Sequence, residues 1–161
     1  ASKAASDVVF KRYGLPSPQM DSMDRVIGDI DSMNILNLEK LFNKYGWMGK
    51  ELIGLEAVNR VFIILLHAPL SYQKKYFNFI EAAVNKGELQ KQCIAYLTDK
   101  ILAKKGKKQL YGTQLQYSRE TKSYHFKPIE NEKDVNSRRK EYGLRPIEDY
   151  AKDFGIDYRV Q

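Results

Sequence analysis

A run of thirteen residues without a charged side chain, Val61 to Gln73, constrains the fold more than any other part of the sequence. Its first six residues, Val61 to Leu66, are all apolar, and Pro69 interrupts it. Thirteen residues are too few for a bilayer-spanning helix, which needs about 20. The run therefore predicts a helix that is buried on all sides in a globular chain and that ends before Pro69.

Apolar residues recur at helical spacing on both sides of this run. In the segment Asp21 to Tyr45 the residues expected to face the core are Ile27, Ile30, Leu38, Leu41 and Tyr45, with Asp21 or Ser22 as the N-cap. Other helices are expected at Asp7 to Tyr13, Leu55 to Leu66, Ser71 to Gly87, Glu88 to Lys105, Asn131 to Tyr142 and Ile147 to Phe154.

Residues 108–127 depart from the helical pattern. They are rich in Tyr and Thr, and Arg119 to Thr121 form a polar break, so a two-stranded hairpin is predicted. The expected fold class is mainly α (α+β): an antiparallel helical bundle with one small β-hairpin. A chain of 161 residues suits one domain, so residues 1–20 are interpreted as an N-terminal arm and residues 21–161 as a single helical domain.

The net charge of +7 is concentrated in one segment. Between Lys100 and Lys127 stand eight Lys and Arg residues and a single Glu, interleaved with tyrosines. Such a surface suits nucleic acid, because cations meet phosphates and rings stack on bases. The favoured interpretation needs no nucleic acid, since lysines commonly protect the edge of a hairpin from further pairing.

Common catalytic and metal-binding motifs do not support a cofactor or a metal. The segment Gly49 to Gly54 has the outline of a phosphate loop, but Leu55 and Glu56 follow where Lys and Ser/Thr are required. The two histidines and the lone Cys93 cannot build a His or Cys metal cage, and Cys93 is interpreted as a core residue. The chain begins at Ala1 without Met or an apolar leader, and the sequence leaves the compartment open between the cytoplasm and export with removal of a signal peptide before Ala1.

Polar side chains at positions where the pattern predicts burial are the more informative signal, because an unpaired buried polar group costs about 1–3 kcal/mol. Singly, each has a structural explanation: a helix cap for His67, packed amides for Asn34 and Gln73, a solvated residue for Asp99 and a turn for Gly112. Together, short helix connections place Asp31, Asn34, His67 and Gln73 at one end of the bundle. A hairpin over that end would close a polar pocket.

These residues also carry a resemblance that covers about residues 25–150. The chain resembles an uncharacterised bacterial domain family marked by a Tyr-Gly-Thr-Gln element, in the order Asp31-x-x-Asn34, Tyr45-Gly46-Trp47, Gly54, His67-Ala68, Gln73, Ala95-Tyr96-Leu97-x-Asp99, Gln109-x-Tyr111-Gly112-Thr113-Gln114, Pro128-Ile129-Glu130, Arg138-Arg139 and Gly143-Leu144. Two positions depart from the family pattern: Pro69 replaces an Asp, and Lys100 replaces an Arg. The resemblance supports the choice of residues and implies no assigned activity.

The first functional hypothesis is a hydrolase or transferase with a polar pocket around His67. His67 would act as general acid or base, oriented by Asp31 or Asp99. A small polar or anionic ligand would be bound by Asn34, Gln73, Gln109, Tyr111, Gly112, Thr113, Gln114, Arg138 and Arg139.

The second hypothesis is a non-catalytic binding module. The same polar residues would hold the hairpin on the bundle, and the basic hairpin surface would meet an acidic protein or nucleic acid. A third interpretation, a polar core with a purely structural role, explains each residue singly, so the sequence leaves the choice between enzyme and non-enzyme open.

Overall fold

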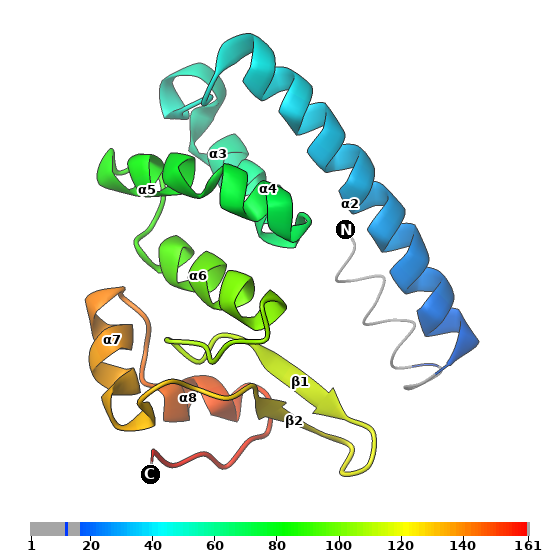
Figure 1. Ribbon diagram of the computed structural model, residues 1–161, viewed down its shortest axis with the longest axis vertical. Helices are drawn as coiled ribbons and strands as arrows, with labels where there is room; N and C mark the ends of the chain where they lie inside the picture. The colour runs from blue at the N-terminus through cyan, green and yellow to red at the C-terminus, as the bar shows by residue number, and fades with distance from the viewer. Residues whose placement is uncertain (1–11, 13–16, 161) are drawn as a thin grey trace.

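The computed structural model describes residues 12 and 17–160, and this part of the chain is mainly helical with one small hairpin, as the sequence predicts (Figure 1). The elements are α2 (Pro18–Tyr45), α3 (Lys50–His67), α4 (Leu70–Lys75), α5 (Phe77–Asn85), α6 (Gln92–Lys104), β1 (Leu115–Ser118), β2 (Ser123–Phe126), the 3-10 helix η1 (Glu132–Asp134), α7 (Val135–Glu141) and α8 (Ile147–Lys152).

The long helix α2 runs along one side of the molecule, and α3, α4 and α5 gather near its C-terminal end (Figure 1). Helix α6 lies between this group and a second group made by the hairpin, α7 and α8. The main core is built by α2 to α6, and a smaller cluster of Ala95, Tyr111 and Leu144 joins α6 to the second group. Helix α6 is therefore the element through which the two groups contact one another.

Helix α3 carries the apolar run, and its burial differs from the prediction. Val61, Phe62 and Leu65 are buried, but Ile63 is 51% exposed. Because α3 contacts α2, α4 and α6, which cover only part of its circumference, one face remains in solvent. The helix ends at His67, as Pro69 predicts, whereas its start is earlier than expected: it begins at Lys50, with a kink at Gly54.

Helix α2 buries a different stripe from the predicted one. Ile35, Leu38 and Phe42 face the core. Three residues predicted to be buried are 43% to 53% exposed: Ile30, Leu41 and Tyr45. Apolar residues stand on more than one face of this helix, so spacing alone allows two stripes, and packing against α3 selects one of them. The helix also begins at Pro18, so neither Asp21 nor Ser22 is its N-cap.

Two other predicted helices differ in extent. The segment Ser71 to Gly87 forms α4 and α5, with a break at Tyr76, whose buried ring packs on Phe42 with centroids 4.8 Å apart. The predicted helix from Glu88 begins only at Gln92. Glu88 instead accepts hydrogen bonds from the Trp47 indole N–H, at 2.9 Å, and from the backbone N–H of Lys50. Its carboxylate thereby satisfies a free N–H at the start of α3.

The hairpin is shorter than the predicted segment 108–127. Strands β1 and β2 pair antiparallel from Leu115 opposite Phe126 to Ser118 opposite Ser123, and residues 108–114 form a loop before them. Aromatic rings of the C-terminal region cover one side of the hairpin: Tyr124 lies 5.9 Å from Phe154 between centroids. The hairpin is thus held by packing as well as by strand pairing.

The predicted C-terminal helices are present with altered ends: residues 132–141 form η1 and α7, and α8 ends at Lys152. The predicted helix Asp7 to Tyr13 lies outside the described residues except for Arg12, and the boundary between arm and domain stays a prediction. None of the helices in residues 17–160 combines the length and hydropathy that crossing a bilayer requires.

Replacing Gly112 by alanine tests how tightly the loop before the hairpin is packed. The new Cβ would lie 2.4 Å from Cδ1 of Ile147, and φ is +65°, which is unfavourable for L residues. Gly143→Ala is the control, because its φ is also positive and its Cβ would meet open space. We expect Gly112→Ala to lower the free energy of unfolding by about 1–3 kcal/mol more than Gly143→Ala in urea denaturation. Equal losses would contradict the close approach of Ile147.

Candidate functional site

The structure separates the predicted site residues into two groups. One group, which we name the Asp99 latch, joins α6, the loop before the hairpin and α7; it comprises Asp99, Gln109, Tyr111, Gly112, Thr113, Gln114, Arg138 and Arg139. The other, which we name the His67 site, lies where the end of α3 meets α2 and α6; it comprises His67, Asp31, Lys100 and Lys104.

Asp99 is fully buried, and its carboxylate is surrounded by hydrogen-bond donors. Oδ1 accepts from the backbone N–H of Leu110, at 2.7 Å, and Oδ2 accepts from the N–H and hydroxyl of Thr113, both at 3.0 Å. The N–H of Tyr111 also donates to this carboxylate. Burial raises the pKa of Asp99, and these hydrogen bonds act in the opposite direction. The loop is therefore wrapped around one carboxylate of α6.

Gln109 in the latch also uses both ends of its side-chain amide in hydrogen bonds to the backbone. Its amide Nε2 donates to the backbone carbonyls of Gln114, at 2.9 Å, and Lys127, at 2.7 Å. Its Oε1 accepts from the N–H of Gln114 at 2.8 Å. The amide thus joins the two chain segments at the base of the hairpin, and its complete burial excludes solvent from these bonds.

The paired arginines of α7, predicted to hold an anion, donate to backbone carbonyls. Arg139 is 1% exposed, and its Nε and Nη1 donate to Arg145 at 2.7 Å and Tyr111 at 2.6 Å. Its guanidinium also lies over the Tyr150 ring, and burial lowers its pKa. Arg138 donates to the carbonyl of Leu110 at 2.7 Å. These contacts fix the latch to α7.

In the His67 site an imidazole and a carboxylate from different helices face one another. Nδ1 of His67 lies 3.9 Å from Oδ2 of Asp31, and the two side chains are 50% and 35% exposed. His67 ends α3 because Ala68 and Pro69 are extended. The imidazole is thus held at a helix end, beside α2, and is open to solvent.

Two lysines on one face of α6 complete this site, four residues apart. Nζ of Lys104 donates to the carbonyl of Ala68 at 2.7 Å, next to His67 in the chain. Lys100 is half-buried, and burial and the charge of Lys104 lower its pKa. Burial first, and then the charge of Lys100, lower the pKa of His67, while Asp31 opposes them. The imidazole is therefore neutral at neutral pH, beside two cations.

The two remaining predicted ligand-binding residues, Asn34 and Gln73, belong to neither group, but each lies next to a residue or element of the His67 site. Asn34 is half-buried one helical turn after Asp31. Gln73 is fully buried, and its Nε2 donates to the carbonyl of Leu66 at 2.7 Å. Its Oε1 is buried without a hydrogen-bond partner in the described part of the chain. An unpaired buried acceptor is uncommon in a folded protein.

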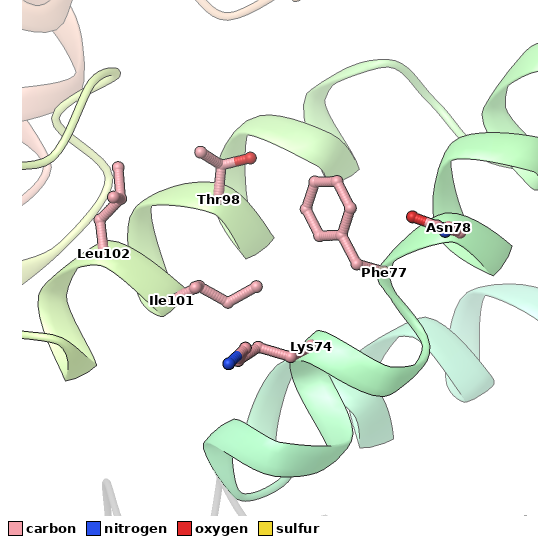
Figure 2. A pocket seen from close by; sticks show the side chains of 6 residues that line it. All are labelled: Lys74, Phe77, Asn78, Thr98, Ile101 and Leu102. Carbon is pink, nitrogen blue, oxygen red and sulfur yellow. The ribbon is translucent and has the colours of Figure 1, made fainter.

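Pockets elsewhere are lined by other residues. An open cavity of about 330 Å³ lies between α4, α5 and α6, and Figure 2 shows Phe77 and Ile101 projecting into it. A second cavity, of about 370 Å³, is lined in part by Cys93, whose pKa burial raises to about 11. That thiol is protonated at neutral pH, which agrees with its interpretation as a core residue. Neither cavity is lined by a predicted site residue.

The model of a family of unknown function, DUF6624, matches residues 4–160. The chain belongs to the DUF6624 family. Neither the search of curated proteins nor the search of solved structures found a match. The resemblance to an uncharacterised domain family is thereby confirmed at the level of the family, and the family description assigns no activity. Function in this DUF6624 chain must be argued from its geometry.

Lys100 and Lys104 are the residues of the His67 site that were not predicted as site residues from the sequence. Their signal was present, since Lys100 and Lys104 are spaced by one helical turn in a segment whose apolar residues face inward. Among the described residues of the DUF6624 chain, no three His, Cys, Asp or Glu side chains are grouped so that they could hold a metal ion.

The Asp99 latch predicts a large stability loss for Asp99→Ala. The substitution leaves the N–H groups of Leu110, Tyr111 and Thr113 buried without an acceptor, so we expect a loss of about 3 kcal/mol in urea denaturation. Asp149→Ala is the control: this aspartate is exposed, and its ion pair with Lys152 lies in solvent, where such a pair contributes little to stability. Similar losses in both variants would show that the loop is not held by Asp99.

The His67 site predicts the direction of two pKa changes, measured by NMR titration of the imidazole. His67 is expected to titrate below the ordinary histidine value of about 6.5. Asp31→Asn removes a negative charge and lowers the pKa further, whereas Lys100→Gln removes a positive charge and raises it. The chain has only one other histidine, His125, so His67→Asn assigns the signals. Shifts of the opposite sign would refute the arrangement of charges.

Proposed function

We propose that this DUF6624 chain is a small hydrolase or group-transfer enzyme that acts on an anionic substrate, with His67 as general acid and base. One observation carries the proposal: the solvent-open His67 imidazole lies 3.9 Å from the Asp31 carboxylate. At 3.9 Å the two groups are not hydrogen-bonded, so Asp31 acts on one ring nitrogen through its charge and leaves the other nitrogen to exchange protons with a substrate.

The electrostatics of the site support a base at neutral pH. The pKa of His67 is lowered, so the ring is neutral and able to accept a proton. In hydrolysis it would take a proton from water as the water oxygen bonds to the carbon or phosphorus of an ester. The imidazolium would then return this proton to the leaving oxygen as the old bond breaks, and Asp31 would stabilise the charged ring between the two steps.

The lysines support an anionic substrate. Lys100 is half-buried and makes no hydrogen bond or ion pair with another described residue. Burial and the charge of Lys104 lower its pKa, and the charge of Asp31 opposes them. Two cations of like charge beside one imidazole are mutually unfavourable, and a bound phosphate or carboxylate would relieve this repulsion. Lys100 is therefore assigned to substrate binding, while Lys104 is already bonded to Ala68.

Within this proposal the Asp99 latch has a structural role. Its carboxylate, the Gln109 amide and its guanidinium groups are hydrogen-bonded to the backbone, with few polar atoms left for a ligand. Gln73 is the exception among the buried residues because its Oε1 has no partner in the described part. We assign Asp31, His67 and Lys100 to the reaction, with Gln73 and Asn34 as candidate ligand contacts.

Hydrolysis of p-nitrophenyl acetate and p-nitrophenyl phosphate tests the proposal. We expect turnover of at least one of them and a fall in kcat/KM of about 10²-fold or more in His67→Asn. Lys100→Gln should raise mainly KM, and only for p-nitrophenyl phosphate, because the acetate ester is uncharged. The matched control is His125→Asn, which changes the other histidine, on β2, and is expected to leave turnover unchanged.

In parallel, inorganic phosphate is titrated against the His67 NMR signal, with saturable shifts expected. Absence of both turnover and shifts would refute the proposal, as would full activity in His67→Asn. The alternative is a non-catalytic module that uses the exposed Arg119 and Lys122 of the hairpin. Tight, salt-sensitive binding of a random oligonucleotide, unchanged in His67→Asn, would favour that alternative.

A further inference from the structure

We infer that this chain forms an antiparallel dimer in which the outer face of α2 packs on the same face of a second copy. Five exposed positions, which we name the α2 seam, define this face: Val26, Ile30, Met33, Asn37 and Leu41. Their spacings of four and three residues place them within an arc of about 80° on the helix. The inference does not depend on the proposed enzymatic function.

The α2 seam is apolar and lies opposite the buried stripe. Its four apolar side chains are 43% to 64% exposed, with Met33 the most exposed. Ile35, Leu38 and Phe42 point the other way, into the core. In Figure 1 no described element lies beyond the outer edge of α2. A helix with apolar residues on two opposite faces is expected to be covered on both.

The seam has the sequence pattern of a helix-to-helix contact. Positions 26, 30, 33 and 37 follow the alternating four-three spacing of a coiled coil. Asn37 stands at one of these positions, and a single polar residue in such a seam commonly selects one register and orientation at some cost in stability. An identical helix supplies the matching spacing, so a second copy suits this face.

Charges beside the seam select the antiparallel orientation. Asp29 and Lys40 are exposed on the same flank of α2, one toward each end of the seam. In a parallel two-fold pair this flank of one copy would lie on the side of the interface away from the same flank of the other, so neither charge would meet an opposite charge. In an antiparallel pair with its two-fold axis near Met33, Val26 faces the partner's Leu41. Asp29 then lies about 3 Å along the axis from the partner's Lys40, and the same pairing recurs by symmetry.

This dimer leaves the His67 site accessible. Asp31 lies on the side of α2 that faces His67, at Nδ1–Oδ2 3.9 Å, and not on the seam. One helix therefore uses its inner face for the core and the site and its outer face for the second copy. Dimerisation would hold α2, and with it Asp31, in place beside α3.

Sedimentation velocity over a range of protein concentrations tests the inference. We expect a reversible dimer, and Met33→Glu is expected to weaken it by at least about tenfold because it buries two carboxylates at the axis. Leu52→Glu is the matched control: Leu52 on α3 is also 64% exposed but lies outside the seam. Circular dichroism of each variant confirms that the helices are retained.

Exchange of the flanking charges tests the orientation. Asp29→Lys alone should weaken the dimer, because it places lysine beside the partner's Lys40, and addition of Lys40→Asp should restore it. A monomeric parent at every soluble concentration overturns the inference, as does equal weakening by Met33→Glu and Leu52→Glu. A dimer that the second charge change does not restore overturns the antiparallel arrangement.

Discussion

The contact between the Asp99 carboxylate and the loop before the hairpin is the interaction on which the second half of the structure depends. The N–H groups of Leu110, Tyr111 and Thr113 converge on this one buried carboxylate, which belongs to a helix of the main bundle. Without an acceptor at this point the loop would bury several unpaired donors. The same loop offers its carbonyls to Arg138 and Arg139, so α7 also depends on the conformation that Asp99 imposes.

The polar residues therefore fall into two groups with different roles, one structural and one open to a ligand. In the latch nearly every polar atom is paired, which makes the region rigid and leaves it little capacity for a ligand. In the His67 site the imidazole is open to solvent, the half-buried Lys100 makes no hydrogen bond or ion pair with another described residue, and the Asp31 carboxylate lies 3.9 Å from the imidazole. Unsatisfied groups at an accessible place are what a binding or catalytic site requires. Asp99 of the latch and Lys100 and Lys104 of the His67 site lie on the same helix, α6, so the rigid latch helps to fix the position of the site.

Part of this structure was predictable from the sequence. Pro69 correctly predicted the end of α3, and the conflict between apolar pattern and polar chemistry correctly indicated burial of Gln73, Asp99 and Gln109. The same argument wrongly indicated burial of His67, whose side chain is 50% exposed. The sequence did not predict that Asp99 and Gln109 belong to a different group from His67. Spacing along a helix says which residues share a face, and it does not say which distant backbone amides meet them. The latch partners are backbone N–H groups, which every sequence contains.

Helix α2 shows the same limit of pattern analysis from another side. Its apolar residues permit two stripes, and the sequence interpretation assigned Ile30 and Leu41 to the core, where the structure has Ile35 and Phe42. A pattern that predicts burial is equally satisfied by a core and by a partner, because both remove apolar surface from water. Ile30 and Leu41 were assigned to the core, but their spacing suits the proposed contact with a second copy of the chain.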